Sequence, residues 1–80
     1  MKTLATFNLE NILASDGITE MKIWGKNGIY TVTTGNKAPE FDLDNYGCEN
    51  KDDLLYLAKR SLKRVKENSA NEVINFIENL

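Results

Sequence analysis

The sequence predicts a small α+β domain in which a three-stranded antiparallel sheet packs against two C-terminal helices. Two observations predict this fold class. An Asn-Gly pair separates two strand-like segments in the first half, and apolar residues recur at helical spacing in the second half. The 80 residues are enough for one domain, spanning 1–80, and too few for two. The hydrophobic content of 41% is arranged in periodic blocks, which favours a folded chain over a disordered one.

The N-terminal segment fits either a strand or a short helix. A strand at 3–7 would place alternate apolar residues on one face, namely Ala5, Phe7 and Leu9. A helix over 8–14 would begin at Asn8, a good N-cap residue, and would align Leu9, Ile12 and Leu13 along one side. We favour a short N-terminal helix and keep the strand as the alternative.

A β-hairpin is the most specific local prediction. Residues 20–25 and 29–33 are strand-like, and Asn27-Gly28 suits a two-residue type I′ turn, whose central positions both need a positive φ. This turn fixes the cross-strand pairs: Met21 with Thr34, Lys22 with Thr33, Ile23 with Val32, Trp24 with Thr31 and Gly25 with Tyr30. The side that carries Met21, Ile23, Tyr30 and Val32 is the more apolar one, so we expect it to face the core.

The third strand is expected at 40–44, where Phe41 and Leu43 alternate with acidic residues after Pro39. The first helix is expected from its N-cap at Asn50 to about Glu67. Its apolar stripe comprises Leu54, Leu55, Ala58, Leu62 and Val65. A capping box at 69–72 is expected to open the second helix, whose apolar residues are Val73, Ile74, Phe76, Ile77 and Leu80. Helices on one side of the sheet would leave the other side, with Trp24, open.

The composition argues against an enzyme. The chain contains no histidine, the commonest general base, so Ser-His and Cys-His nucleophile pairs are excluded. Cys48 is the only cysteine and can form neither an internal disulfide nor a paired thiol site. We therefore expect no catalytic residue and no cofactor. The sequence has no apolar run of about 20 residues and turns polar soon after its start, so we expect a cytoplasmic protein without membrane association.

The charges are segregated along the second half of the chain, although the net charge is only −2. An acidic segment carries Glu40, Asp42, Asp44, Glu49, Asp52 and Asp53 against Lys51. A basic segment follows and carries Lys59, Arg60, Lys63, Arg64 and Lys66. Such a dipolar surface favours fast, salt-sensitive docking onto a charged partner.

The leading hypothesis is a small non-catalytic module that binds another protein or protein complex. The expected contact residues lie on the open side of the hairpin and in the acidic segment: Lys22, Trp24, Thr31, Asp42, Asp44 and Glu49. The alternative for Trp24 is a core position beneath the N-terminal segment. In size and charge alone the chain is similar to small phage-borne inhibitors that dock on host complexes. An inhibitor from a phage or a bacterial mobile element is therefore the finer expectation.

Two other functions remain open. A nucleic-acid-binding protein would use an aromatic and four cations on one helix, namely Tyr56, Lys59, Arg60, Lys63 and Arg64. A calcium-binding module would use the loop 42–53, which has the outline of an EF-hand with Asp42, Asp44, Gly47, Asn50 and Asp53 at ligand or turn positions. Tyr46 and Glu49 depart from that motif, so the leading hypothesis contains no metal ligand.

Overall fold

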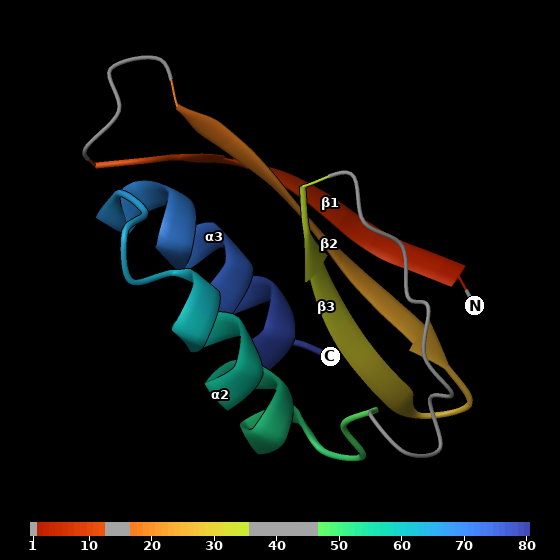
Figure 1. The fold of residues 1–80 in the computed structure, drawn as a ribbon. Helices are drawn as coiled ribbons and strands as arrows, with labels where there is room; N and C mark the ends of the chain where they lie inside the picture. Colours follow the sequence, from red (N-terminus) through yellow and green to blue (C-terminus); the bar gives the residue numbers. More distant parts are fainter. Residues whose placement is uncertain (1, 13–16, 36–46) are drawn as a thin grey trace.

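The computed structural model describes residues 2–12, 17–35 and 47–80, which form a three-stranded sheet with two helices on one of its faces (Figure 1). In chain order the elements are β1 (Lys2–Glu10), β2 (Ile18–Lys26), β3 (Ile29–Thr34), α2 (Lys51–Ser61) and α3 (Glu67–Glu78). The sheet is antiparallel with the strand order β1-β2-β3. This architecture confirms the predicted α+β fold class.

The hairpin between β2 and β3 forms as the Asn-Gly signal predicts. All five predicted cross-strand pairs are present, from Met21 opposite Thr34 to Gly25 opposite Tyr30. Asn27 has a φ of 53° and Gly28 a φ of 79°, the left-handed pair that a type I′ turn requires. Met21 and Ile23 are fully buried, so the predicted core-facing side is also confirmed.

The N-terminal segment is a strand, so the favoured short helix is wrong over residues 8–12. β1 pairs with β2 from Lys2 opposite Gly25 to Glu10 opposite Ile18, with a bulge between Thr3 and Ala5. An N-cap at Asn8 would contribute only about 1 kcal/mol, whereas pairing with β2 satisfies a whole row of backbone groups. The predicted strand at 40–44 lies outside the residues described, and the third strand of the sheet is β1.

Helix α2 begins where the sequence predicts and ends earlier. The Oδ1 atom of Asn50 accepts a hydrogen bond from the backbone N–H of Asp53 at 2.9 Å, which is the predicted N-cap. The helix ends at Ser61 instead of continuing to about Glu67. The segment after it hydrogen-bonds to the end of β1: the carbonyl of Arg64 accepts from Ile12, and the N–H of Lys66 donates to Glu10. The N–H of Lys66 therefore does not donate to the carbonyl of Leu62, as it would if the helix continued.

Helix α3 begins at Glu67 with Lys66 as its N-cap residue, so the predicted capping box at 69–72 is wrong. Ser69 lies inside the first turn, and its hydroxyl accepts a hydrogen bond from the backbone N–H of Glu10 at 3.2 Å. Ser69 thus holds the end of β1 against α3 instead of capping the helix. Neither helix is long and apolar enough to cross a membrane.

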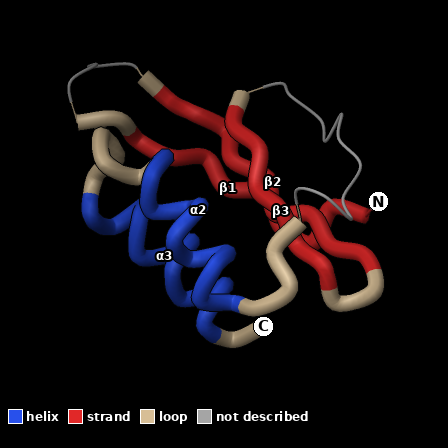
Figure 2. The backbone as a smooth tube through the Cα atoms, turned by 60° about the horizontal axis from the view of Figure 1, so that its bottom comes forward, coloured by secondary structure: helices blue, strands red, loops and turns tan. Residues whose placement is uncertain are grey.

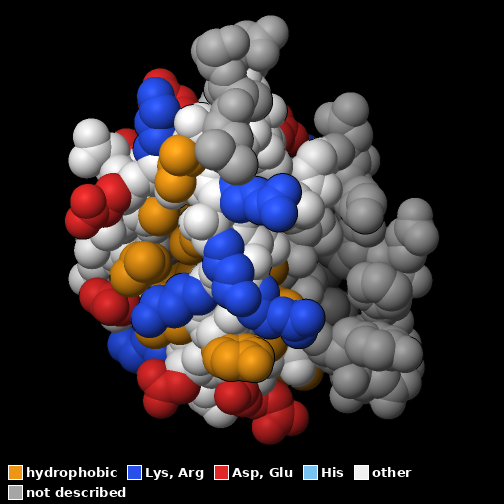
Figure 3. Space-filling view, turned by 60° about the vertical axis from the view of Figure 1, so that its left-hand side comes forward, with side chains coloured by type: hydrophobic (Ala, Val, Ile, Leu, Met, Phe, Trp, Pro, Cys, Tyr) orange, Lys and Arg blue, Asp and Glu red, His pale blue; other side chains and the backbone are white. Residues whose placement is uncertain are grey.

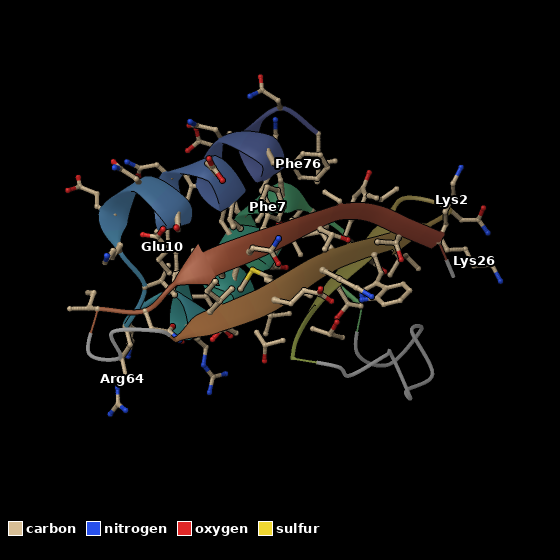
Figure 4. All side chains as sticks on the ribbon, turned by 90° about the horizontal axis from the view of Figure 1, so that it is seen from above. Lys2, Phe7, Glu10, Lys26, Arg64 and Phe76 are labelled. Atoms are coloured by element: carbon tan, nitrogen blue, oxygen red, sulfur yellow. The ribbon has the colours of Figure 1, made fainter. Side chains whose placement is uncertain are left out.

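The core lies between the sheet and the two helices, which cover the same face (Figure 2). Helix α3 packs against β1 and helix α2 against β3. The buried hydrophobic residues are Leu9, Met21, Ile23, Leu54, Ala58, Leu62, Val65, Val73 and Ile77. At the edge of this core, the rings of Phe7 and Phe76 meet edge to face with centroids 5.7 Å apart (Figure 4). The helices therefore bury one face of the sheet only.

Candidate interaction surfaces

The sheet face turned away from the helices carries Lys22, Trp24, Thr31 and Thr33, and is called the open face below. These residues alternate with the core-facing residues of β2 and β3, so they point to the opposite side. Trp24 is half-buried. β1 lies beside β2, with Thr3 as the strand partner of Trp24. The described part of the N-terminal segment thus extends the sheet and does not bury Trp24 in the core.

The indole of Trp24 is held in place by two neighbours. Its Nε1–H donates a hydrogen bond to Oγ1 of Thr33 at 2.9 Å. The Nζ atom of Lys22 lies 5.9 Å from the ring centroid, within cation–π range, and 3.5 Å from a carboxylate oxygen of Glu20. Both contacts fix the ring orientation before any partner binds. Thr31, the strand partner of Trp24, is only 8% exposed, so it supports the indole more than it offers contact area.

The acidic residues are only partly placed. Glu49 is exposed and lies just before the N-cap of α2. Asp52 and Asp53 are exposed in the first turn of that helix. Asp42 and Asp44 lie outside the residues described. The structure therefore groups Lys22, Trp24 and Thr31 on one surface and sets Glu49 at the start of α2.

The basic residues gather at the end of α2 and in the turn that follows. Tyr56, Lys59 and Arg60 belong to α2, whereas Lys63 and Arg64 belong to the turn. All five side chains are exposed, Tyr56 at 71%. Lys and Arg side chains cluster on the helical side of the molecule beside exposed hydrophobic groups (Figure 3). The predicted cations are thus close together, on a helix and a turn instead of one continuous helix.

Two of the residues that would bind calcium, Asn50 and Asp53, hydrogen-bond to each other instead. The amide of Asn50 accepts from the backbone N–H of Asp53 and donates to Oδ2 of Asp53 at 3.1 Å. These two residues therefore interact with each other at the helix N-terminus. Across 2–12, 17–35 and 47–80, no group of three or more His, Cys, Asp or Glu side chains could hold a metal ion.

Cys48 has an unreactive environment. Its backbone pairs with Tyr30 through two hydrogen bonds, which link the segment before α2 to the edge of β3. Burial of the thiol, with a smaller contribution from the Asp53 carboxylate, raises the pKa of Cys48 above its ordinary value. A raised pKa keeps the thiol protonated near neutral pH, and the thiolate is the nucleophilic form.

One exposed residue of the open face was missed by the sequence analysis. Ile18 is 67% exposed at the start of β2, and it shares the alternation of Glu20, Lys22 and Trp24. The predicted strand began at residue 20, so Ile18 was left out. Extending the alternation by one more pair of residues would have found it.

Comparison with known proteins gives no match: no family model, curated protein or solved structure matches this chain. The fold and its surfaces therefore define the class, a small α+β domain whose sheet is covered by helices on one face.

Proposed function

We propose that this chain is a small non-catalytic module that binds another protein in the cytoplasm through the open face of its sheet. The observation that carries this proposal is the position of Trp24. Its half-buried indole lies on the face that the helices leave free, held there by Thr33 and Lys22. Tryptophan is enriched among the residues that dominate binding energy at protein interfaces.

The pre-set orientation of the indole favours binding. Ordering a mobile side chain at an interface costs roughly 0.5–1.5 kcal/mol, and a ring already fixed by two contacts avoids most of that cost. The surrounding Lys22 and Thr33 provide a polar rim, while Trp24 provides a large rigid contact area. This combination suits a protein partner with an apolar pocket bordered by acceptor groups.

Charge supports the same proposal at longer range. Glu49, Asp52 and Asp53 form an exposed acidic group at the start of α2. Asp42 and Asp44, which lie outside the residues described, are proposed as further contact residues. An acidic group of this kind accelerates encounter with a basic surface. The finer proposal is that the partner is a host protein complex and that the chain inhibits it by occupying such a surface.

The test is a pull-down with the tagged protein from an extract of the source cell, performed with and without nuclease treatment. We compare wild type with Trp24→Ala, and use Ile12→Ala as a control that removes an exposed apolar side chain beyond the end of β1. The wild type and the control should capture the same protein, and Trp24→Ala should capture about thirtyfold less, which corresponds to about 2 kcal/mol. Equal capture by Trp24→Ala, or loss of all capture after nuclease, would refute the proposal.

A second candidate is nucleic-acid binding by Tyr56, Lys59, Arg60, Lys63 and Arg64, because these exposed side chains cluster at one end of α2. An electrophoretic shift measured over a salt series tests it. A shift at low salt that weakens steeply as salt rises would favour this candidate, since phosphate contacts release counterions. Absence of a shift at low salt would exclude it.

A further inference from the structure

The exposed side of α2 has a charge pattern that is complementary to itself. Acidic residues lie in the first turn, basic residues lie in the last turn, and Tyr56 lies midway between them. The helix turns by about 100° per residue, which puts Tyr56 opposite the buried residues Leu54 and Ala58 and near the centre of the exposed side. The exposed side of α2 is therefore acidic at its N-terminal end, aromatic at its centre and basic at its C-terminal end.

An antiparallel contact between two copies of this surface brings opposite charges together. If a two-fold axis passes through Tyr56, each residue faces the one that lies equally far from Tyr56 in the other copy. The facing pairs are Asp52 with Arg60, Asp53 with Lys59 and, just beyond the helix ends, Glu49 with Lys63. Each of these six side chains is exposed. Every pair joins an acid to a base, and each pair occurs twice.

We propose that this chain self-associates through α2, packed antiparallel against α2 of a second copy with the two Tyr56 rings in contact on the axis. Asp53 accepts a hydrogen bond from the neutral amide of Asn50, which does not neutralise its charge. The ion pairs formed within the described ranges, Lys22–Glu20 and Lys66–Glu10, use none of the facing charges. Antiparallel helices also set the negative end of one helix dipole beside the positive end of the other.

A second copy fits this surface better than a nucleic acid does. A phosphate backbone would meet Lys59 and Arg60 at one end of the helix and would be repelled by Asp52 and Asp53 at the other. A second copy of the chain would form ion pairs with both the acidic and the basic end of the helix. Because 11 residues of helix are only about 16 Å long, the contact is smaller than a standard stable interface. The dimer should therefore be weak, reversible and sensitive to salt.

The first experiment is analytical ultracentrifugation of the protein, before and after nuclease treatment, over a concentration series. At about 20 mM salt the dimer fraction should rise with concentration, and about 500 mM salt should reduce it, since the charge pairs are exposed. A monomer at every concentration and salt would overturn the proposal. So would an association that nuclease treatment abolishes.

Two charge-reversal variants then test the pairing. The basic variant carries Glu49→Lys and Asp52→Lys, which leaves the Asn50–Asp53 cap intact, and the acidic variant carries Arg60→Glu and Lys63→Glu. Each alone should associate at least tenfold more weakly than wild type, because like charges then face each other. An equimolar mixture should form a heterodimer about as tight as the wild-type dimer, because every facing pair again joins an acid to a base. The control, Glu72→Lys with Glu78→Lys on α3, should associate like wild type.

Circular dichroism establishes that each variant is folded, and Tyr56→Ala gives a further test that leaves every charge in place. This variant should also weaken the dimer, because it removes the central contact. Unchanged association of either charge variant, or failure of their mixture to form a heterodimer, would contradict pairing through α2. These outcomes do not depend on Trp24, so they are independent of the proposed protein-binding function.

Discussion

Replacing Trp24 with alanine tests whether this residue belongs to a surface or to the core. Truncating a fully buried tryptophan costs roughly 3–5 kcal/mol. Trp24 is half-buried, so about 2 kcal/mol is expected. This total includes about 1 kcal/mol for the hydrogen bond to Thr33 and about 0.5–1 kcal/mol for the contact with Lys22. For a domain of this size, about 2 kcal/mol lowers the Tm by roughly 10 °C.

The matched comparison is Ile23→Ala, at the neighbouring position on the other face of β2. Ile23 is fully buried, so its truncation should cost roughly 2–5 kcal/mol and leave a cavity. Unfolding in urea is followed by far-ultraviolet circular dichroism, because Trp24 is the only tryptophan and its removal abolishes the fluorescence signal. Two further variants divide the Trp24 contribution: Thr33→Val removes the hydrogen-bond acceptor, and Lys22→Met removes the cation.

The expected order of decreasing stability is wild type, then Trp24→Ala, then Ile23→Ala. If Trp24→Ala were as destabilising as Ile23→Ala, the indole would be a core side chain and the open face would not be free. If Trp24→Ala had no effect on stability, Thr33 and Lys22 would not hold the ring. In either case Trp24 would not be a binding residue with a pre-set orientation.

The N-cap of α2, the Cys48 thiol and the calcium-binding alternative each give a further prediction. Asn50→Ala should destabilise the chain by about 1 kcal/mol in urea unfolding because it removes the N-cap of α2, whereas Asn71→Ala, at an exposed position in α3, should change stability by less than about 0.5 kcal/mol. Cys48 should react with iodoacetamide more slowly in the folded than in the urea-unfolded chain at pH 8, because its pKa is higher in the folded chain. The contribution of the protonated thiol to stability is therefore complete below the unfolded pKa of about 8.5. It declines as the pH rises through the pKa of the folded state. Millimolar calcium should leave the Tm the same as a chelator does, and a rise of several degrees would instead support the calcium-binding alternative.

The hairpin could be predicted from the sequence because the residues that determine its turn and register are adjacent in the chain. Asn27 and Gly28 require one turn type, and that turn fixes the register of every pair in β2 and β3. The start of α2 is local in the same way, since Asn50 caps a backbone group three residues away. The prediction that the helices leave the Trp24 side uncovered followed from the register.

A strand at the N-terminus was one of two predicted alternatives, but neither the choice of strand over helix nor the end of α2 could be predicted, because both depend on residues far apart in the chain. Residues 8–12 have a plausible helical pattern, and pairing with β2 overrides it. Residues 62–66 also have a helical pattern, and hydrogen bonds to Glu10 and Ile12 override that one. One long-range contact thus explains both errors. The same contact explains why Lys59 and Arg60 lie in α2 whereas Lys63 and Arg64 lie in the turn after it, although one continuous helix was predicted.

The attachment of β1 to the start of α3 has a consequence for how the chain is made. The hydrogen bond from Glu10 to Ser69 spans 59 residues of an 80-residue protein. On the ribosome, β1 can pair with β2 soon after both are translated, whereas α3, which packs against β1, is translated much later. A nascent chain stalled ahead of Ser69 would leave the apolar side chains of β1, such as Phe7, without the helix that packs against them, and such exposed apolar surface promotes aggregation.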